Sequence, residues 1–430
     1  MKNRFIIDNK ITNEFVEKYT KTTYRIIGKN KHSFIKPCYW LEQRLMTGRD
    51  NRNCYKGVFG IKSHRCLQNT PSLPFCNHQC VFCWRDIEIG SLGADFVVEP
   101  DDPKFLVDEM IRHQQDIIKN HLPLRRYLDN YEIMIDVLYY MLLNSNENHN
   151  LNSLSNKIHV SRNKIERAIN LLKNQEYIKP KDQLLQNFEL DDDFRCCIES
   201  RDEIELLINR ELTTPDEIME THSEAMYPTH AAISLDGEPL LYPRLSEFVE
   251  EFRKRNITTF IVTNGTLPEK IGKLEPLPSQ LYITLPSPNE EIYKTVCRPM
   301  IKNGWEKIKE SLSLIESLAC RTLVRLTAVK DLNLKDHYLK DYIKIIEKAN
   351  PNFFEIKGFT LQAKALLIKE RLKSDKSLQS YFPEYDYLEE IALKFEELSG
   401  FPLIYKNKAS RDFLFAVNWD KNNDPKIINP

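Results

Sequence analysis

The sequence predicts an α/β protein built as a partial (β/α)6-type barrel, with a small helical module inserted into it. Apolar, β-prone runs alternate with amphipathic stretches over the C-terminal half, which is typical of parallel βαβ units. Turn residues directly follow two of these runs. A helical stretch of roughly 80 residues interrupts the pattern, and this is within the size range of a small domain.

The predicted strands and helices follow from spacing. The strand-like runs are Ala231–Leu235, Thr259–Thr263, Gln280–Leu285, Thr322–Thr327 and Phe353–Lys357. Between the third and fourth runs, the stretch Gly304–Ser317 has apolar residues at helical spacing. Ligands of such barrels bind at the C-terminal ends of the strands, where Gly237-Glu238-Pro239 and Asn264-Gly265 lie.

The interruption itself has the pattern of three helices and a wing. Apolar residues between 134 and 142 predict one helix, Leu151 to Ile158 a second, and Ser161 is a plausible N-cap of a third. Tyr177-Ile178-Lys179 then begins a strand. This order resembles a winged helix, which could contact nucleic acid. The candidate contacts are Arg162, Lys164 and Arg167. Acidic flanking residues favour the alternatives, a protein-facing winged helix or a loose helical insert.

Three closely spaced cysteines, Cys76, Cys80 and Cys83, give the clearest chemical signal. A [4Fe–4S] cluster usually takes four thiolates, so the spacing Cys-x3-Cys-x2-Cys leaves one iron open. This pattern resembles the radical S-adenosylmethionine (SAM) enzymes, in which that iron binds SAM and the cluster cleaves it to a 5′-deoxyadenosyl radical. A zinc site completed by His64 or His78 is the alternative.

The residues at the ends of two predicted strands also fit the binding of SAM. Radical SAM enzymes carry a Gly-Glu element at the end of the second strand, and it holds the amino group of SAM. Gly lets a ligand approach the backbone closely. The resemblance therefore implies a SAM site, whose expected residues are Gly237, Glu238, Pro239, Thr263 and Asn264.

A second set of cysteines, Cys38, Cys54 and Cys66, lies upstream of the first. Crowded cysteines can form a disulfide framework in a secreted protein. However, the N-terminus has no apolar stretch typical of a signal peptide, and no apolar run is long enough to span a membrane. We therefore expect metal ligation in a reducing cytoplasm. The spacing of Cys196, Cys197, Cys297 and Cys320 suggests no role.

Longer runs resemble the archaeal tRNA 4-demethylwyosine synthase family of radical SAM enzymes. The matching runs are Lys36–Trp40, Cys54–Lys56, Gly60–Pro71, Cys76–Arg85, Pro100–His113, Ile233–Pro243, Val296–Met300 and Gly304–Lys307. The resemblance implies a lyase that converts N1-methylguanosine in phenylalanine tRNA into 4-demethylwyosine, using two carbons of pyruvate.

By the same resemblance, the chain holds two [4Fe–4S] clusters. Cys76, Cys80 and Cys83 would bind the SAM cluster. Cys38, Cys54 and Cys66 would bind the second cluster, whose open iron engages pyruvate. Lys56 matches a lysine that forms a Schiff base with pyruvate. Partial desolvation predicts a lowered pKa for this lysine, which would supply the free amine.

The C-terminal third departs from the family pattern. Thr284–Pro288 replaces a Ser-Leu-Asp-Ala-Pro strand, and Lys357-Gly358-Phe359 is not followed by Gly-Tyr-Ser-Arg. The cysteine spacings of the second set also differ. A two-cluster radical SAM enzyme with another substrate is therefore an alternative, and so is a cluster-bearing regulator that binds nucleic acid.

The expected organisation is an N-terminal second-cluster region at 1–75, a barrel at 76–122 and 202–430, and the inserted module at 123–201. Lys+Arg 61 against Asp+Glu 62 gives no global basic field, so tRNA binding would need local patches. Lys29–Lys36 and Arg49–Arg52 are candidates. We found no flavodoxin-like segment, so a separate flavodoxin or ferredoxin is the expected electron donor.

Overall fold

The computed structural model describes residues 5–20, 24–47, 54–87, 92–121, 124–174, 176–181, 187–195, 198–211, 214–420 and 424–426. The chain divides into two compact units. The larger unit consists of Met1–Leu41, Arg52–Ile117 and Met226–Pro430. The smaller unit consists of Glu42–Asn51 and Ile118–Ala225.

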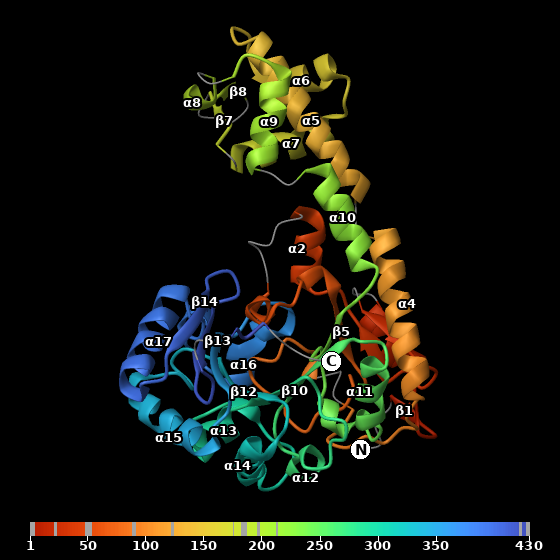
Figure 1. Cartoon of the computed structure of the whole chain (residues 1–430), viewed down its shortest axis with the longest axis vertical. Coiled ribbons are helices and arrows are strands. Elements are labelled where there is room, and N and C mark those ends of the chain that lie inside the picture. The colour runs from red at the N-terminus through yellow and green to blue at the C-terminus, as the bar shows by residue number, and fades with distance from the viewer. Residues whose placement is uncertain are drawn as a thin grey trace. The chain divides into compact units, whose positions relative to one another are not determined.

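A single curved sheet organises the larger unit (Figure 1). Its strands are β3 (Arg25–Ile27), β4 (Ser33–Ile35), β5 (Cys66–Thr70), β9 (His230–Ile233), β10 (Thr258–Thr263), β11 (Gln280–Thr284), β12 (Arg321–Ala328), β13 (Phe353–Gly358), β14 (Leu403–Asn407) and β15 (Asp412–Ala416). The strand order is β14-β15-β13-β12-β11-β10-β9-β5-β4-β3. From β5 to β13 each strand pairs in parallel with the next, and the strands at both edges pair antiparallel.

This run of parallel strands confirms the predicted partial barrel. The five predicted strands correspond to β9 through β13, with small shifts at their ends. The strand β5 was not predicted, because it begins at Cys66 inside the cysteine-rich region and carries polar residues. It supplies the first parallel strand, which pairs with β9 from Cys66 to Asn69.

Helices cover the outer face of the sheet (Figure 1). The helices and short strands outside the smaller unit are β1 (Ile6–Ile7), β2 (Lys10–Ile11), α1 (Asn13–Thr20), α2 (Tyr39–Thr47), α4 (Pro103–His121), α11 (Leu245–Arg253), α12 (Pro268–Ile271), α13 (Glu290–Cys297), α14 (Gly304–Leu314), α15 (Leu339–Ala349), α16 (Ile368–Leu372) and α17 (Tyr385–Ser399), of which α2 and α4 continue into the smaller unit. Each of the longer ones buries an apolar stripe. In α15, Tyr342, Ile343 and Ile346 recur at helical spacing and pack into the main core.

The smaller unit has its own sheet and its own core. Its elements are α5 (Leu124–Leu143), β6 (His149–Asn150), α6 (Leu151–Ile158), α7 (Arg162–Asn174), β7 (Ile178–Pro180), β8 (Asn187–Leu190), α8 (Asp192–Arg195), α9 (Arg201–Glu211) and α10 (Pro215–Ala225). The strand order β6-β8-β7 is antiparallel throughout. Helix, strand, two helices and a two-stranded wing follow one another from α5 to β8, which is the arrangement of a winged helix.

The boundaries of the smaller unit differ from the range 123–201 expected for the inserted module. Helices α9 and α10 lie within this unit, and Ile204 and Ile208 of α9 belong to its core. The functional division into 1–75, 76–122 with 202–430, and 123–201 stays a prediction.

The side chains of α7 give limited support to nucleic-acid contact. The Lys164 ammonium forms an ion pair with Asp129 at 2.7 Å. Arg167 is half-buried, and its Nε atom has no hydrogen-bond partner. Of the three predicted contacts, Arg162 alone is exposed. The predicted basic patch Lys29–Lys36 lies in the larger unit, whereas Arg49–Arg52 lies outside the described residues. No described helix is both long and apolar enough to cross a membrane.

Because the two units have separate hydrophobic cores, we expect each unit to unfold in its own transition. Leu138 of α5 is fully buried in the core of the smaller unit. Leu138→Ala should therefore destabilise this unit by about 2–5 kcal/mol and leave the larger one unchanged. Differential scanning calorimetry should show one of two transitions moving to lower temperature. Leu143→Ala, on the same helix but at a side chain 62% exposed, is the control and should move neither transition. A single transition that shifts as a whole would contradict the prediction.

Candidate active site

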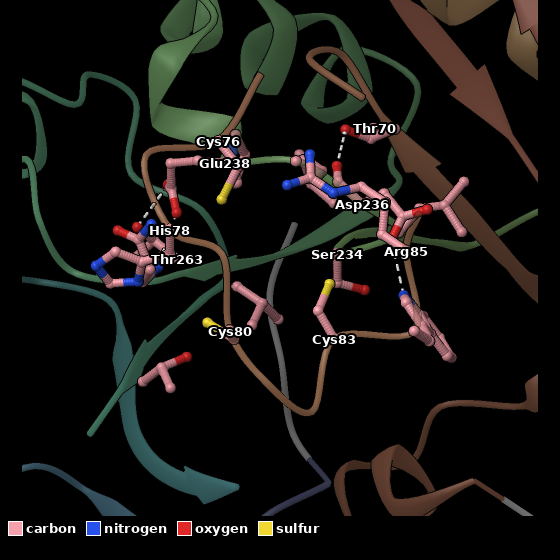
Figure 2. Close-up of a pocket in the computed structure, with 18 of the residues that line it drawn as sticks. Thr70, Cys76, His78, Cys80, Cys83, Arg85, Ser234, Asp236, Glu238 and Thr263 are labelled. Carbon is pink, nitrogen blue, oxygen red and sulfur yellow. Dashed lines mark hydrogen bonds between the residues drawn. The ribbon is translucent and has the colours of Figure 1, made fainter. Parts of the chain in front are cut away.

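A pocket opens at the C-terminal ends of the parallel strands β5, β9, β10 and β11 (Figure 2). Its lining includes Cys76, His78, Cys80 and Cys83 from one loop and Ser234, Asp236, Gly237, Glu238, Pro239, Thr263, Asn264 and Thr284 from the strand ends. The structure thus brings together all three cysteines of the first set and all five residues predicted to bind SAM. Figure 2 shows the cysteine loop wrapped along one side of the pocket, with Glu238 and Thr263 facing it.

Backbone hydrogen bonds fix the cysteine loop to the barrel. The Gln79 N–H donates to the Cys297 carbonyl at 2.9 Å, and the Val81 N–H donates to the Val296 carbonyl at 2.9 Å. Both acceptors lie at the end of α13, on the outside of the barrel. The Arg371 guanidinium also donates to the carbonyl of Val81 at 3.2 Å. The loop therefore keeps its shape through contacts with segments distant in the sequence.

Glu238 connects the cysteine loop to two strands. Its carboxylate accepts hydrogen bonds from the Thr263 hydroxyl at 2.6 Å and from the Asn264 N–H at 2.8 Å. Its own N–H donates to the Phe75 carbonyl at 2.8 Å. The side chain is only 2% exposed, and burial raises the pKa of the carboxyl group. A buried carboxylate fixed in this way is suited to a cationic amino group, which a SAM molecule would supply.

Gly237 occupies a position that only glycine can take. Its φ is +77°, in the left-handed region, and a Cβ atom there would lie 2.2 Å from the Ser72 carbonyl oxygen. The Phe75 carbonyl oxygen would be 2.9 Å away. The predicted Gly-Glu turn is therefore required by the close approach of the strand end to the segment that leads into the cysteine loop.

Asp236 and Arg85 belong to the pocket but were missed from the sequence. The Asp236 carboxylate accepts hydrogen bonds from the Tyr24 hydroxyl at 2.5 Å and from the Trp84 indole N–H at 2.7 Å. The Arg85 guanidinium is buried and donates to the Leu73 carbonyl at 3.3 Å. Their positions in the sequence could have identified them as pocket residues, because Asp236 directly precedes Gly237 and Arg85 follows Cys83 by two residues.

The charge of Arg85 favours the thiolate forms of its neighbours. Burial raises the pKa of Cys76 to about 12 and that of Cys83 to about 11, and the Arg85 charge opposes both shifts. Burial lowers the pKa of Arg85, but Cys76 and Cys83 outweigh it and raise this pKa above its ordinary value. Metal ligation requires thiolates, and a bound metal displaces the thiol protons. Three cysteines, a buried cation and the carboxylate of Glu238 fit a [4Fe–4S] cluster with SAM on its open iron.

The zinc alternative keeps two of its predicted ligands, His78 and Cys80, in a cluster that adds Cys297. Within the described residues, the potential ligand atoms of these three side chains lie within 4.8 Å of one another. The sequence did not suggest Cys297, because it lies far along the chain, at the end of α13. A hydrogen bond of 2.8 Å joins the Nε2 atom of His78 to the Tyr293 hydroxyl. His64, the other predicted fourth ligand, lies between Cys54 and Cys66 in the sequence. Its side chain is buried, and it is absent from the pocket lining.

The second set of cysteines lies in the same unit as the pocket. Cys54 and Cys66 are buried, and Cys38 is partly buried. Burial, together with the charges of Cys66 and Cys54, raises the pKa of Cys38 to about 12. Burial likewise raises the pKa of Cys66 to about 11. The three thiols are therefore close enough to influence one another electrostatically.

Lys56 lies among these thiols, but its expected pKa shift has the wrong direction. The side chain is 5% exposed and belongs to the short helix η2 (Tyr55–Phe59). Burial lowers its pKa, as predicted, but the charges of Tyr55 and the three cysteines outweigh burial and raise the pKa above its ordinary value. The prediction of a lowered pKa is wrong because it counted desolvation and omitted the neighbouring thiols.

The position of Gly237 gives a direct test of the pocket. Gly237→Ala should lose SAM binding and destabilise the larger unit by about 1–3 kcal/mol, because the new Cβ atom meets backbone on two sides. Equilibrium dialysis with SAM and thermal unfolding of reconstituted protein measure both effects. Gly272→Ala is the matched control, since its Cβ would come no closer than 3.7 Å to a neighbour. SAM binding by Gly237→Ala at wild-type affinity would contradict this account of the turn.

Comparison with known proteins agrees with this geometry. The model of the Radical SAM superfamily matches residues 195–344. The S-adenosyl-L-methionine-dependent tRNA 4-demethylwyosine synthase of Pyrococcus horikoshii is 36% identical over 350 residues, which are 80% of this chain and 74% of that protein. The corresponding enzyme of Pyrococcus abyssi is 35% identical over 350 residues, with the same coverage.

The fold also agrees with a solved structure. The structure of TYW1 with a lysine-pyruvate adduct bound superposes with a TM-score of 0.62 at 23% identity, covering 97% of this chain and 99% of that one. The pocket supplies three cysteines on one loop and a buried carboxylate at the strand ends, as the radical SAM chemistry requires. Together with the identity to the Pyrococcus horikoshii enzyme over most of both chains, it shows that this chain belongs to the tRNA 4-demethylwyosine synthase family of radical SAM enzymes.

Proposed function

We propose that the chain converts N1-methylguanosine in phenylalanine tRNA into 4-demethylwyosine, using two carbons of pyruvate. The observation that carries this proposal is the presence, in one unit, of a SAM-type pocket and of a buried lysine among three further cysteines. The P. horikoshii relative bears the name of this activity. Family membership identifies the chain as an enzyme, so the hypothesis of a non-catalytic regulator is not retained.

The SAM pocket has a defined division of roles. Cys76, Cys80 and Cys83 would hold the first [4Fe–4S] cluster, which when bound supplies the electron that cleaves SAM. The Glu238 carboxylate would accept the amino group of SAM. The hydroxyl of Thr263 and the backbone N–H of Asn264 hold that carboxylate in place. Gly237 and Pro239 shape the turn that presents it.

The second cysteine set would hold a second [4Fe–4S] cluster through Cys38, Cys54 and Cys66. Lys56 would attack the carbonyl carbon of pyruvate with its free amine and, with loss of water, form an imine. A lysine–pyruvate adduct is described for the TYW1 structure, whose fold this chain shares. The buried position of Lys56 supports this role, because a desolvated site excludes water that would hydrolyse the imine.

The remaining partners follow from the reaction. The proposed substrate is phenylalanine tRNA, and Lys29–Lys36 is a candidate contact in the larger unit. Reduction of the SAM cluster would require a separate electron donor such as a flavodoxin or ferredoxin. Free thiols at both cysteine sets favour a reducing compartment, and we propose the cytoplasm.

The reaction can be tested with purified components. Reconstituted protein, SAM, pyruvate, dithionite and phenylalanine tRNA containing N1-methylguanosine should yield 4-demethylwyosine, detected by mass spectrometry of the nucleosides. A variant with Ala at 76, 80 and 83 should yield none, since no ligands remain for the SAM cluster. Cleavage of SAM without a change in the tRNA would instead indicate a different substrate.

Lys56 can be tested separately from the radical chemistry. Borohydride reduction in the presence of pyruvate should trap an adduct at Lys56, which peptide mass spectrometry locates. Lys56→Arg keeps the charge but cannot form the imine, so product formation should fall at least about 100-fold while SAM cleavage continues. Lys62→Arg, an exposed lysine between Cys54 and Cys66, is the control. Full activity of Lys56→Arg would exclude the Schiff-base role.

A further inference from the structure

Several buried polar atoms inside the barrel have no hydrogen-bond partner among the residues that the structure describes. They include His230 Nε2, Gln280 Nε2, Tyr282 OH, Arg321 Nη2 and Arg325 Nη2, from strands β9, β11 and β12 of the parallel part of the sheet. All five side chains are at least nine-tenths buried. A buried donor without an acceptor costs free energy, and native proteins rarely leave several of them in one place. Such a group of atoms indicates that this part of the barrel receives a polar ligand.

Arg325 contacts the ring of Tyr55, the residue directly before Lys56. Its Cζ atom lies 4.4 Å from the centre of the Tyr55 ring and 4.6 Å from the centre of the Tyr282 ring. The Lys56 Nζ atom lies 5.3 Å from the centre of the same Tyr55 ring. Arg325 and Lys56 therefore approach one aromatic side chain from two elements of the fold, β12 and η2.

Two of the three guanidinium nitrogens of Arg325 form hydrogen bonds within the described structure. Its Nε atom donates to the buried carboxylate of Glu355, and its Nη1 atom donates to the Tyr55 hydroxyl at 3.4 Å. The Nη2 atom has no partner, although the side chain is only 8% exposed. Two fixed nitrogens orient the third, and a free guanidinium edge is the protein group best suited to bind a carboxylate.

Cations gather around the Tyr55 ring. Besides Lys56 and Arg325, the Lys357 Nζ atom lies 4.3 Å from the ring centre. Glu355 pairs with Arg325, and Asp412 pairs with Lys357 at 3.5 Å. These two carboxylates pair with Arg325 and Lys357, whereas no carboxylate of the described residues forms an ion pair with Lys56. This arrangement favours an anionic ligand over a neutral one.

We infer that Arg325 is a substrate-binding residue whose Nη2 atom holds the carboxylate of a small 2-oxo acid while the carbonyl group of that acid faces Lys56. The inference rests on the proposed function, in which Lys56 forms an imine with pyruvate. It adds the residue that selects a 2-oxo acid from neutral carbonyl compounds. Arg325 acts by binding and orientation, and it exchanges no proton in this role.

The test compares two carbonyl compounds in the borohydride assay at Lys56. Pyruvate carries the carboxylate and acetone does not. In Arg325→Gln, the pyruvate concentration giving half-maximal adduct should rise about 10- to 100-fold, the range for a lost charge-assisted hydrogen bond. The adduct with acetone should form as in the wild type. Equal losses with both compounds would indicate a structural role for Arg325 and overturn the inference, and so would an unchanged response to pyruvate.

Two further variants keep the test decisive. Arg325→Gln leaves Glu355 buried and unpaired, which can prevent folding, so Arg325→Gln with Glu355→Gln removes both charges together. This double variant should show the same selective loss for pyruvate. Arg411→Gln is the control, because Arg411 is a half-buried arginine of the same unit whose guanidinium already donates to the Pro383 and Phe359 carbonyls. An equal loss of pyruvate affinity in Arg411→Gln would indicate a general charge effect and overturn the inference.

Oxamate separates this inference from the proposed function. Oxamate has the carboxylate of a 2-oxo acid but an amide in place of the ketone, so it does not form an imine. Calorimetry should show that it binds wild-type protein and binds Arg325→Gln at least 10-fold more weakly. Failure to trap any adduct at Lys56 would overturn the Schiff base and leave this measurement valid. Equal binding of oxamate to both proteins would overturn the role of Arg325.

Discussion

The carboxylate of Glu238 is the junction on which the SAM pocket depends. It accepts hydrogen bonds from Thr263 and Asn264 at the end of β10, while its backbone N–H donates to the Phe75 carbonyl just before the cysteine loop. One residue thus sets the distance between two strand ends and the segment that carries Cys76. Gly237 is part of the same constraint, because any side chain there would push β9 away from Ser72. The pocket is therefore a property of the assembled sheet and cannot form from the loop alone.

The two cysteine sets lie in different electrostatic surroundings. Arg85 is the buried cation beside Cys76 and Cys83, and its charge favours their thiolates. At the second set the corresponding cation is Lys56, which the proposed mechanism needs as a nucleophile. Lys56 favours the thiolate form of Cys66, and the negative charge of the thiolates in turn favours the protonated form of this amine. The pKa of Lys56 in the assembled enzyme then depends on how much negative charge the three cysteines retain.

The sequence predicted those parts of the fold and site that local patterns determine. The strands β9 to β13, the cysteines of the first set and the Gly237-Glu238 turn are all encoded within a few consecutive residues. Cys297 and Arg325 were not predicted as site residues, because their neighbours come from distant segments and only the closed barrel brings them together. The direction of the Lys56 pKa shift was predicted wrongly for the same reason. Desolvation can be guessed from a sequence, whereas the opposing charge of three thiols requires their positions.

Two of the hydrogen bonds between the cysteine loop and α13 join main-chain atoms. The N–H groups of Gln79 and Val81 bind the carbonyls of Cys297 and Val296, so these two bonds do not depend on which side chains occupy those positions. Substitutions other than proline at 79 and 81 preserve both hydrogen bonds. The polarity beside Cys80 can therefore be varied at the partly exposed Gln79 while the loop keeps its course, whereas Val81 is fully buried. The chain has in this loop a place where its chemistry could be modified by evolution or by design at little cost to its architecture.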